Sequence, residues 1–130
     1  MTNKSFSENE LIYEIIGASM EVYNYLGPGL LESVYEKALI QEFRLRNIFV
    51  QSQVSVAVMY KGYHISDDLR IDLLVERSIV VELKAIEHLL PVHFKQTRTY
   101  MKLLNKPTGL LINFDVGDFK DGYKVLRSRQ

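Results

Sequence analysis

The sequence predicts an α/β domain whose elements follow the order α-α-β-β-β-α-β. Two changes of periodicity carry this prediction: helical spacing of apolar residues gives way to alternation after residue 47, and helical spacing returns once from residue 92. The chain has 130 residues, of which 47% are hydrophobic, so it can bury a sizeable core but has no room for a second domain. We therefore expect a single domain spanning residues 1–130.

The first helix is expected from Ser7 to Leu26, because apolar residues recur there every three or four positions. Ser7 is a suitable N-cap, and Glu10 three residues later completes a capping box. The sequence Gly27-Pro28-Gly29 ends this helix, since proline cannot continue it and glycine accepts the left-handed geometry of a helix end.

A second helix is expected from Leu30 to about Arg46, with Asn47 as a plausible C-terminal cap. Its spacing predicts that one apolar face points inward. That face comprises Leu31, Val34, Tyr35, Ala38, Leu39 and Phe43.

Alternating apolar residues then predict a strand from Val54 to Tyr60, which ends at a turn at Lys61-Gly62. Two further strands, residues 70–75 and 79–84, have apolar residues on both faces, as strands covered on both sides do. A helix from Val92 to about Leu104 follows Pro91, and residues 109–114 form a buried strand. Residues 118–127 fit either a short strand or irregular structure.

The bulk composition excludes several classes of protein. The chain contains no cysteine, so it has neither a disulfide framework nor a thiolate site. Its N-terminus lacks a signal-peptide core, and no apolar run reaches the roughly 18 residues of a membrane span. Sixteen basic residues balance sixteen acidic ones, so any nucleic-acid contact must be local. We expect a soluble, intracellular protein of the cytoplasm without membrane contact.

Three charged residues, Asp72, Glu82 and Lys84, occur where buried strands ordinarily carry apolar side chains. If residues 76–78 form an odd-numbered turn, Asp72 lies directly opposite Glu82, and Lys84 shares their face. A turn of even length would place the two carboxylates on opposite faces.

Two adjacent carboxylates repel each other unless a cation lies between them or one is protonated. A Mg²⁺ ion resolves the conflict, because it needs only one or two carboxylates besides water and a phosphate oxygen. Asp72 and Glu82 are therefore candidate ligands of Mg²⁺ or Mn²⁺, and Lys84 could orient a water or offset charge in phosphodiester hydrolysis. The alternative is a cross-strand ion cluster without further function.

The helix at residues 92–104 adds polar candidates. Gln96 and Tyr100 lie four residues apart on one stripe with His93. A separate basic stripe, suited to phosphates or simply to solvent, comprises Lys95, Arg98 and Lys102. In the second helix, Glu32 is a further carboxylate, although the helix dipole alone favours an acidic residue in a first turn.

The segment GLLESVY, from Gly29 through Glu32 to Tyr35, resembles the signature of the small bacterial GxxExxY proteins. The resemblance continues along the chain in LGPGLLESVYEKAL, IDLLV, VVELKAIE, PVHFKQTRTYMKLL and GLLINF. That family is similar to the PD-(D/E)xK nuclease superfamily. The resemblance implies a restriction-endonuclease-like core, in which helices flank a central mixed β-sheet.

The resemblance also implies roles for individual residues. Asp72 and Glu82 would be metal ligands, Lys84 the catalytic lysine and Glu32 an additional acidic residue, and Gln96 with Tyr100 resembles the QxxxY element of RecB-like nucleases. Tyr35 and His93 match family motifs and would have supporting roles. The chain departs from the pattern at Ile71, where the superfamily's name has proline.

Two functions remain open at this point. The first is a Mg²⁺- or Mn²⁺-dependent nuclease that acts on DNA or RNA. The second is a non-catalytic nucleic-acid-binding or protein-interaction module that retains the fold. A domain of this size can also act as a homodimer or with a protein partner, but the sequence identifies no interface.

Overall fold

The computed structural model describes residues 5–128, and its elements follow the predicted order with one strand added at the end. The N-terminal residues 1–4, part of the segment judged not to be a signal peptide, lie outside the described residues, as do residues 129–130. The elements are α1 (Glu8–Leu26), α2 (Glu32–Leu45), β1 (Val50–Tyr60), β2 (Tyr63–Val75), β3 (Ile79–Lys84), α3 (Pro91–Leu103), β4 (Thr108–Asn113), a 3-10 turn (Phe119–Asp121) and β5 (Tyr123–Arg127).

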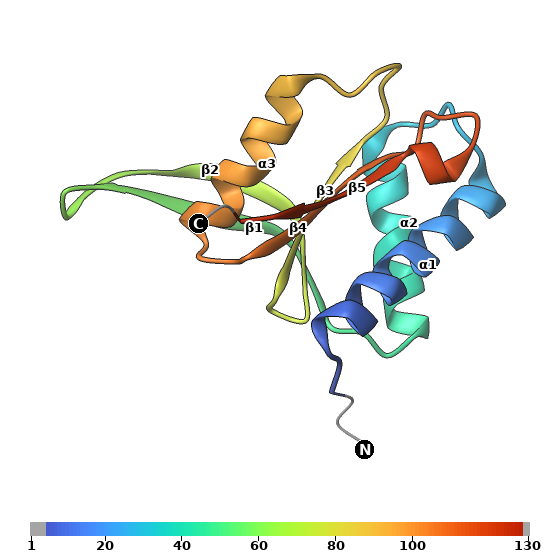
Figure 1. Ribbon diagram of the computed structural model, residues 1–130, viewed down its shortest axis with the longest axis horizontal. Helices are drawn as coiled ribbons and strands as arrows, with labels where there is room; N and C mark the ends of the chain where they lie inside the picture. The colour runs from blue at the N-terminus through green and yellow to red at the C-terminus, as the bar shows by residue number, and fades with distance from the viewer. Residues whose placement is uncertain (1–4, 129–130) are drawn as a thin grey trace.

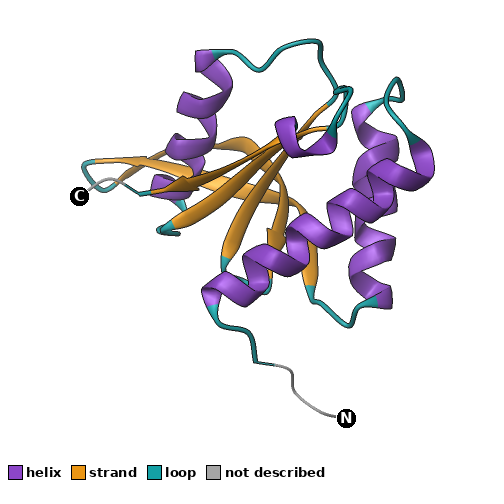
Figure 2. Ribbon diagram, turned by 45° about the vertical axis from the view of Figure 1, so that its right-hand side comes forward, coloured by secondary structure: helices purple, strands orange, loops and turns teal. Residues whose placement is uncertain are grey.

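The strands form one mixed sheet in the order β1-β2-β3-β4-β5. Among the strands of residues 5–128, only β3 and β4 pair in parallel, because α3 carries the chain back across the sheet between them. Helices α1 and α2 cover one face, and α3 covers the other (Figures 1 and 2). The predicted mixed sheet between helices is thus confirmed.

Each face of the sheet has its own core. The core under α1 and α2 includes Ile15, Tyr35, Leu39, Phe43, Leu73, Val81, Leu83 and Phe114. The smaller core under α3 comprises Val56, Ile71, Leu74, Val80, Tyr100, Met101 and Leu126. Strand β3, buried along its whole length but for Lys84, lies between the two cores.

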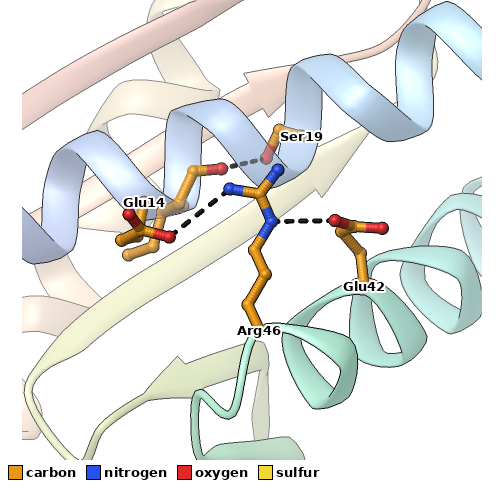
Figure 3. Close-up of polar contacts among 5 residues, drawn as sticks. Glu14, Ser19, Glu42 and Arg46 are labelled. Carbon is orange, nitrogen blue, oxygen red and sulfur yellow. Dashed lines mark hydrogen bonds and ion pairs between the residues drawn. The ribbon is translucent and has the colours of Figure 1, made fainter. Parts of the chain in front are cut away.

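Arg46 joins the two helices on the first face (Figure 3). Its Nε donates to Glu42 of the same helix end at 2.8 Å, and its Nη1 lies 3.4 Å from the Glu14 carboxylate of α1. Gly17 of α1 leaves room for this guanidinium, since a Cβ there would lie 3.1 Å from Nη1. Nearby, the Ser19 hydroxyl donates to the Ile15 carbonyl at 2.7 Å. The two ion pairs of Arg46 hold the end of α2 against α1 and so stabilise the antiparallel arrangement of these helices.

The predicted start of the second helix is two residues early. Helix α2 begins at Glu32, because Leu31 has extended backbone angles as its N-cap. The expected inward positions Leu31 and Val34 are exposed by 74% and 39%, respectively, whereas Tyr35, Leu39 and Phe43 are buried as predicted. Asn47 takes the left-handed conformation expected just beyond a helix end.

The hairpin of β1 and β2 is much longer than predicted. Strand β1 begins at Val50, opposite Val75, and β2 begins at Tyr63, opposite Tyr60, so the hairpin is longer than predicted at both ends. At the turn between the two strands it extends beyond the body of the domain as a free arm (Figure 1). Lys61 and Gly62 both have positive φ and form the tight turn expected there. The ambiguous tail resolves into the 3-10 turn and strand β5, which pairs with β4.

Across the part of the chain that the structure describes, each helix is too short or too polar to cross a bilayer.

Candidate active site

Asp72 and Glu82 lie next to each other where the pairing of β2 and β3 ends. The turn between these strands has three residues, 76–78, and the register runs from Val75↔Ile79 to Leu73↔Val81. One step further along this register brings Asp72 beside Glu82, as the odd-numbered turn predicts. Glu76 and Arg77 have left-handed φ values of 51° and 53°, which close the turn.

Beyond Leu73, hydrogen bonds to the two carboxylates take the place of backbone hydrogen bonds between β2 and β3. The Asp72 N–H donates to Oε1 of Glu82 at 3.2 Å, and the Leu83 N–H donates to Oδ2 of Asp72 at 2.8 Å. Each acid therefore accepts an N–H group that would otherwise lack a strand partner. This exchange fixes the positions of both side chains and leaves other carboxylate oxygens for further contacts.

Gln53 lies in β1 directly across from Asp72, between the pairs Ser52↔Leu73 and Val54↔Ile71. Its φ is 51°, which lies outside the range of an extended strand. On the partner strand, Leu73 packs in the core under α1 and α2, while Ile71 packs in the core under α3. The inward and outward alternation of β2 thus changes at Asp72.

The side chain of Gln53 also contacts two carboxylates. Its Nε2 donates to Glu36 at 2.8 Å and approaches Oδ1 of Asp72 at 3.4 Å. Glu36, in α2, has its pKa raised by partial burial and further by the nearby Asp72 charge. Sequence reasoning did not find Gln53 or Glu36, because neither matches a motif and a left-handed glutamine within a strand has no sequence signal.

Glu82 is the most perturbed acid of this site. It is only 6% exposed, and burial, together with the neighbouring Asp72 charge, raises its pKa to about 8. The hydrogen bond from Asp72 N–H and the charge of Lys84 act in the opposite direction without offsetting the burial. A cation beside the pair would relieve the repulsion.

Helix α2 brings a third carboxylate, Glu32, to the same place. Burial raises the pKa of Glu32, while the nearby Lys84 charge lowers it and Asp72 raises it again. The hydrogen bond from the Ala85 N–H and the nearby His93 also lower the pKa of this carboxylate. Glu32, Asp72, Glu82 and Lys84 therefore form one electrostatic cluster drawn from α2, β2 and β3.

Helix α3 closes the cluster from the other side. Gln96 Nε2 donates to the Tyr100 hydroxyl at 2.9 Å, which confirms the predicted contact along one stripe. The pKa of Tyr100 is raised by burial first and then by the charges of Glu82 and Asp72. The tyrosine hydroxyl and its glutamine partner thus lie close to the carboxylate pair.

Other predicted residues have different surroundings. The ring of Tyr35 is fully buried and stacked on Phe114 at 4.4 Å. Its hydroxyl donates to the Gly27 carbonyl at 2.5 Å and accepts the Leu30 N–H at 3.1 Å. Tyr35 therefore holds the turn that precedes Glu32 and does not face the carboxylates.

His93 accepts the Leu90 N–H through Nδ1 at 2.9 Å and so caps the start of α3. In the basic stripe, Arg98 donates to the Arg127 carbonyl at 2.6 Å, on the β5 side of the helix, whereas Lys95 and Lys102 are exposed. The stripe is thus separate from the carboxylate cluster.

Asn113, a buried residue at the end of β4, was not identified from the sequence. Its side chain donates to the Ile86 carbonyl at 2.8 Å and accepts the N–H groups of Ile86 at 3.1 Å and Asp115 at 3.2 Å. These bonds fix the chain just after Lys84 and Ala85. Asn113 therefore positions the loop whose N–H group acts on Glu32.

The donor set suits a hard divalent cation. Two adjacent carboxylates offer oxygen ligands, and an ion such as Mg²⁺ completes its coordination with water. Within residues 5–128, no group of three acidic, histidine or cysteine side chains surrounds a point that could hold a metal ion. The arrangement consequently fits an ion held by Asp72 and Glu82 with several waters, and not a dehydrated cage of protein ligands.

Comparison with known families gives one result. A model of the PD-(D/E)XK nuclease superfamily matches residues 9–126, which run from the second residue of α1 to the last but one of β5. Searches among curated proteins and among solved structures gave no match.

Proposed function

Because the chain belongs to the PD-(D/E)XK nuclease superfamily, we propose that it is a nuclease that hydrolyses phosphodiester bonds in DNA or RNA with Mg²⁺ or Mn²⁺. Nucleases of this superfamily generally use divalent metal ions and act on nucleic acid. The finer assignment, that this chain is an active enzyme, rests on the cluster of Glu32, Asp72, Glu82 and Lys84.

One observation carries the proposal: two carboxylates lie side by side at the end of a strand pair, at a cost in stability. The raised pKa of Glu82 expresses that cost, because its carboxylate is disfavoured by burial and by Asp72. A purely structural site has no need for such a pair, whereas a cation between the two carboxylates removes the penalty.

The residues of the site would have different roles in the reaction. Asp72 and Glu82 would hold the divalent ion, which when bound polarises the phosphodiester and favours deprotonation of the attacking water. Lys84 would orient that water or offset negative charge on the transferring phosphoryl group. Glu32, beside Lys84, would fix the lysine and accept hydrogen bonds from water.

The helix α3 residues would act on the substrate. Gln96 and Tyr100 present an amide and a hydroxyl beside the carboxylate pair, both suited to hydrogen bonds with phosphate oxygens. His93 would keep the first turn of α3 in place. Lys95, Arg98 and Lys102 would contact phosphates further along a bound strand, and such contacts weaken as salt concentration rises.

The test is a cleavage assay on single- and double-stranded DNA and RNA with Mg²⁺, Mn²⁺ or EDTA. The wild-type chain should cleave at least one substrate with metal and none with EDTA. Asp72→Ala, Glu82→Ala and Lys84→Ala should each lower the rate by about 100-fold or more. Glu21→Ala, an exposed acid of α1, is the matched control and should leave the rate unchanged.

Cleavage that persists in Asp72→Ala and Glu82→Ala would refute this site. Metal-independent binding of nucleic acid without any hydrolysis would instead identify the non-catalytic module.

A further inference from the structure

Gln53 of β1 has a backbone conformation that residues within a strand rarely adopt. Its φ of 51° lies in the left-handed region, which disfavours most residues other than glycine. The pairs Ser52↔Leu73 and Val54↔Ile71 lie on either side of it, so neither strand carries the additional residue of a bulge. Such conformations persist where surrounding contacts hold them, and they occur often at ligand-binding sites.

The Gln53 side chain lies between two carboxylates from different elements. Its Nε2 donates to Oε1 of Glu36, in α2, at 2.8 Å and to Oδ1 of Asp72, in β2, at 3.4 Å. An amide nitrogen has two N–H groups, so one is available for each acid. Gln53 therefore links the proposed metal ligand Asp72 to helix α2.

Both carboxylate oxygens of Asp72 have a donor beside them. Oδ2 accepts the Leu83 N–H at 2.8 Å, and Oδ1 lies 3.4 Å from the Gln53 amide. Two donors on different oxygens oppose rotation of the carboxylate, and each oxygen retains a lone pair for a cation. The Leu83 donor belongs to the backbone, whereas the Gln53 donor is a side chain that a substitution can remove.

The neutral charge of the amide suits a site that binds a cation. A lysine between Glu36 and Asp72 would also donate to both acids, but its positive charge would offset the negative charge that attracts a metal ion. Glutamine donates hydrogen bonds and leaves both carboxylates charged. It can thus orient Asp72 without competing with a divalent ion.

We propose that Gln53, held by Glu36, is a positioning residue that orients Asp72 for a divalent metal ion. This inference rests on the proposed function, because it takes Asp72 as a ligand of that ion. Hydrogen-bond partners of metal ligands contribute roughly 10- to 100-fold to metal affinity. Gln53 is exposed, so water can replace its amide in part, and the lower end of that range is expected.

The experiment measures the Mn²⁺ affinity of the folded protein by electron paramagnetic resonance, without nucleic acid, so that it is independent of cleavage. Gln53→Met keeps the length of the side chain without a donor and should weaken Mn²⁺ binding about tenfold. Gln53→Lys should weaken it further, because its ammonium group competes with the ion. Gln51→Met makes the same change two positions earlier in β1, opposite Leu74, and should bind Mn²⁺ like wild type.

Gln53→Gly separates the amide from the backbone conformation. Glycine adopts positive φ without strain, so this variant should unfold at a higher urea concentration than Gln53→Met. It also lacks the amide, so its Mn²⁺ affinity should stay as low as that of Gln53→Met. If Gln53 served only the fold, the metal affinity would instead recover together with the stability.

Glu36→Asp tests the residue that holds the amide. Aspartate keeps the negative charge but is one methylene group shorter, so its carboxylate withdraws from Nε2 of Gln53. The substitution should weaken Mn²⁺ binding in the wild-type chain and have little further effect in Gln53→Met. An equal loss in both backgrounds would show that Glu36 acts on the ion without Gln53, and would overturn its role here.

The cleavage assay distinguishes a positioning residue from a catalytic one. At saturating Mn²⁺ the rate of Gln53→Met should return to within about twofold of wild type, because Gln53 acts on metal binding and not on the chemical step. Wild-type Mn²⁺ affinity in Gln53→Met, or restored affinity in Gln53→Gly, would overturn this inference and leave the proposed function intact. A wild-type chain that binds no Mn²⁺ would overturn both.

Discussion

Replacing Glu82 by glutamine should stabilise the metal-free protein at neutral and alkaline pH. Glutamine keeps the size of the side chain and an oxygen that can accept the Asp72 N–H, but it carries no charge. The buried Glu82 carboxyl has its pKa raised from 4.5 to about 8, chiefly by burial and then by Asp72. The folded protein therefore retains a proton that the unfolded chain releases.

The sign and the magnitude follow from this difference. Below a pH of 4.5 both states of Glu82 are protonated and its contribution to stability is fully present. As pH rises from there through about 8, that contribution is lost at about 1.4 kcal/mol per pH unit. The loss reaches about 3 kcal/mol at neutral pH and on the order of 5 kcal/mol above pH 8. Glu82→Gln removes this pH-dependent loss of stability.

The assay is urea unfolding of both proteins in EDTA at a series of pH values. The free energy of unfolding should be similar for the two proteins at about pH 5, and the advantage of Glu82→Gln should grow as pH rises. Asp72→Asn should give a smaller gain, because it removes the neighbouring charge and leaves Glu82 buried. Glu21→Gln is the control for a lost exposed charge. An advantage of Glu82→Gln that is absent at alkaline pH would refute the reasoning.

Three further substitutions test the support of the site. Tyr35→Phe should cost about 1–3 kcal/mol, because the Gly27 carbonyl and the Leu30 N–H lose their partner. It should also slow cleavage through Glu32; unchanged thermal unfolding and rate would contradict this role. Asn113→Ala should cost about 2–3 kcal/mol by leaving backbone groups of residues 86 and 115 unpaired. Faster proteolysis of the loop at residues 85–90 should accompany that loss, and an unaltered digestion pattern would argue against it. Gly109→Ala should cost about 1–3 kcal/mol in urea unfolding, since its Cβ would lie 2.8 Å from Met101 Sδ; wild-type stability would show that Met101 moves freely.

The central pair of the site was predictable because strand geometry is periodic. An odd-numbered turn at residues 76–78 was enough to place Asp72 beside Glu82, and the observed register agrees. Periodicity also located α1, β3 and α3 to within one or two residues. Where local pattern and tertiary burial coincide, sequence reasoning succeeds.

The remaining features depend on contacts that have no local pattern. Residues 63–69 carry polar and charged side chains on exposed strands with shifted register, so their alternation is lost and the arm was missed. Strand β5 is short, with Leu126 buried, Tyr123 half-buried and the other three residues exposed, which leaves little periodic signal. Gln53 contacts Glu36 and Asp72 from a position with left-handed backbone angles. Asn113 binds the backbone of Ile86, which lies 27 residues earlier in the chain. Neither effect is encoded in residue spacing.

The most direct test of the central claim is a crystal structure of the protein soaked in Mn²⁺, with anomalous scattering used to locate the ion. The account predicts one Mn²⁺ peak bound by oxygens of Asp72 and Glu82, with water completing the coordination and Glu32 and Lys84 nearby. The peak should disappear in Glu82→Ala crystals. A wild-type structure in which Mn²⁺ binds elsewhere, or in which these two carboxylates point apart, would contradict the proposed site.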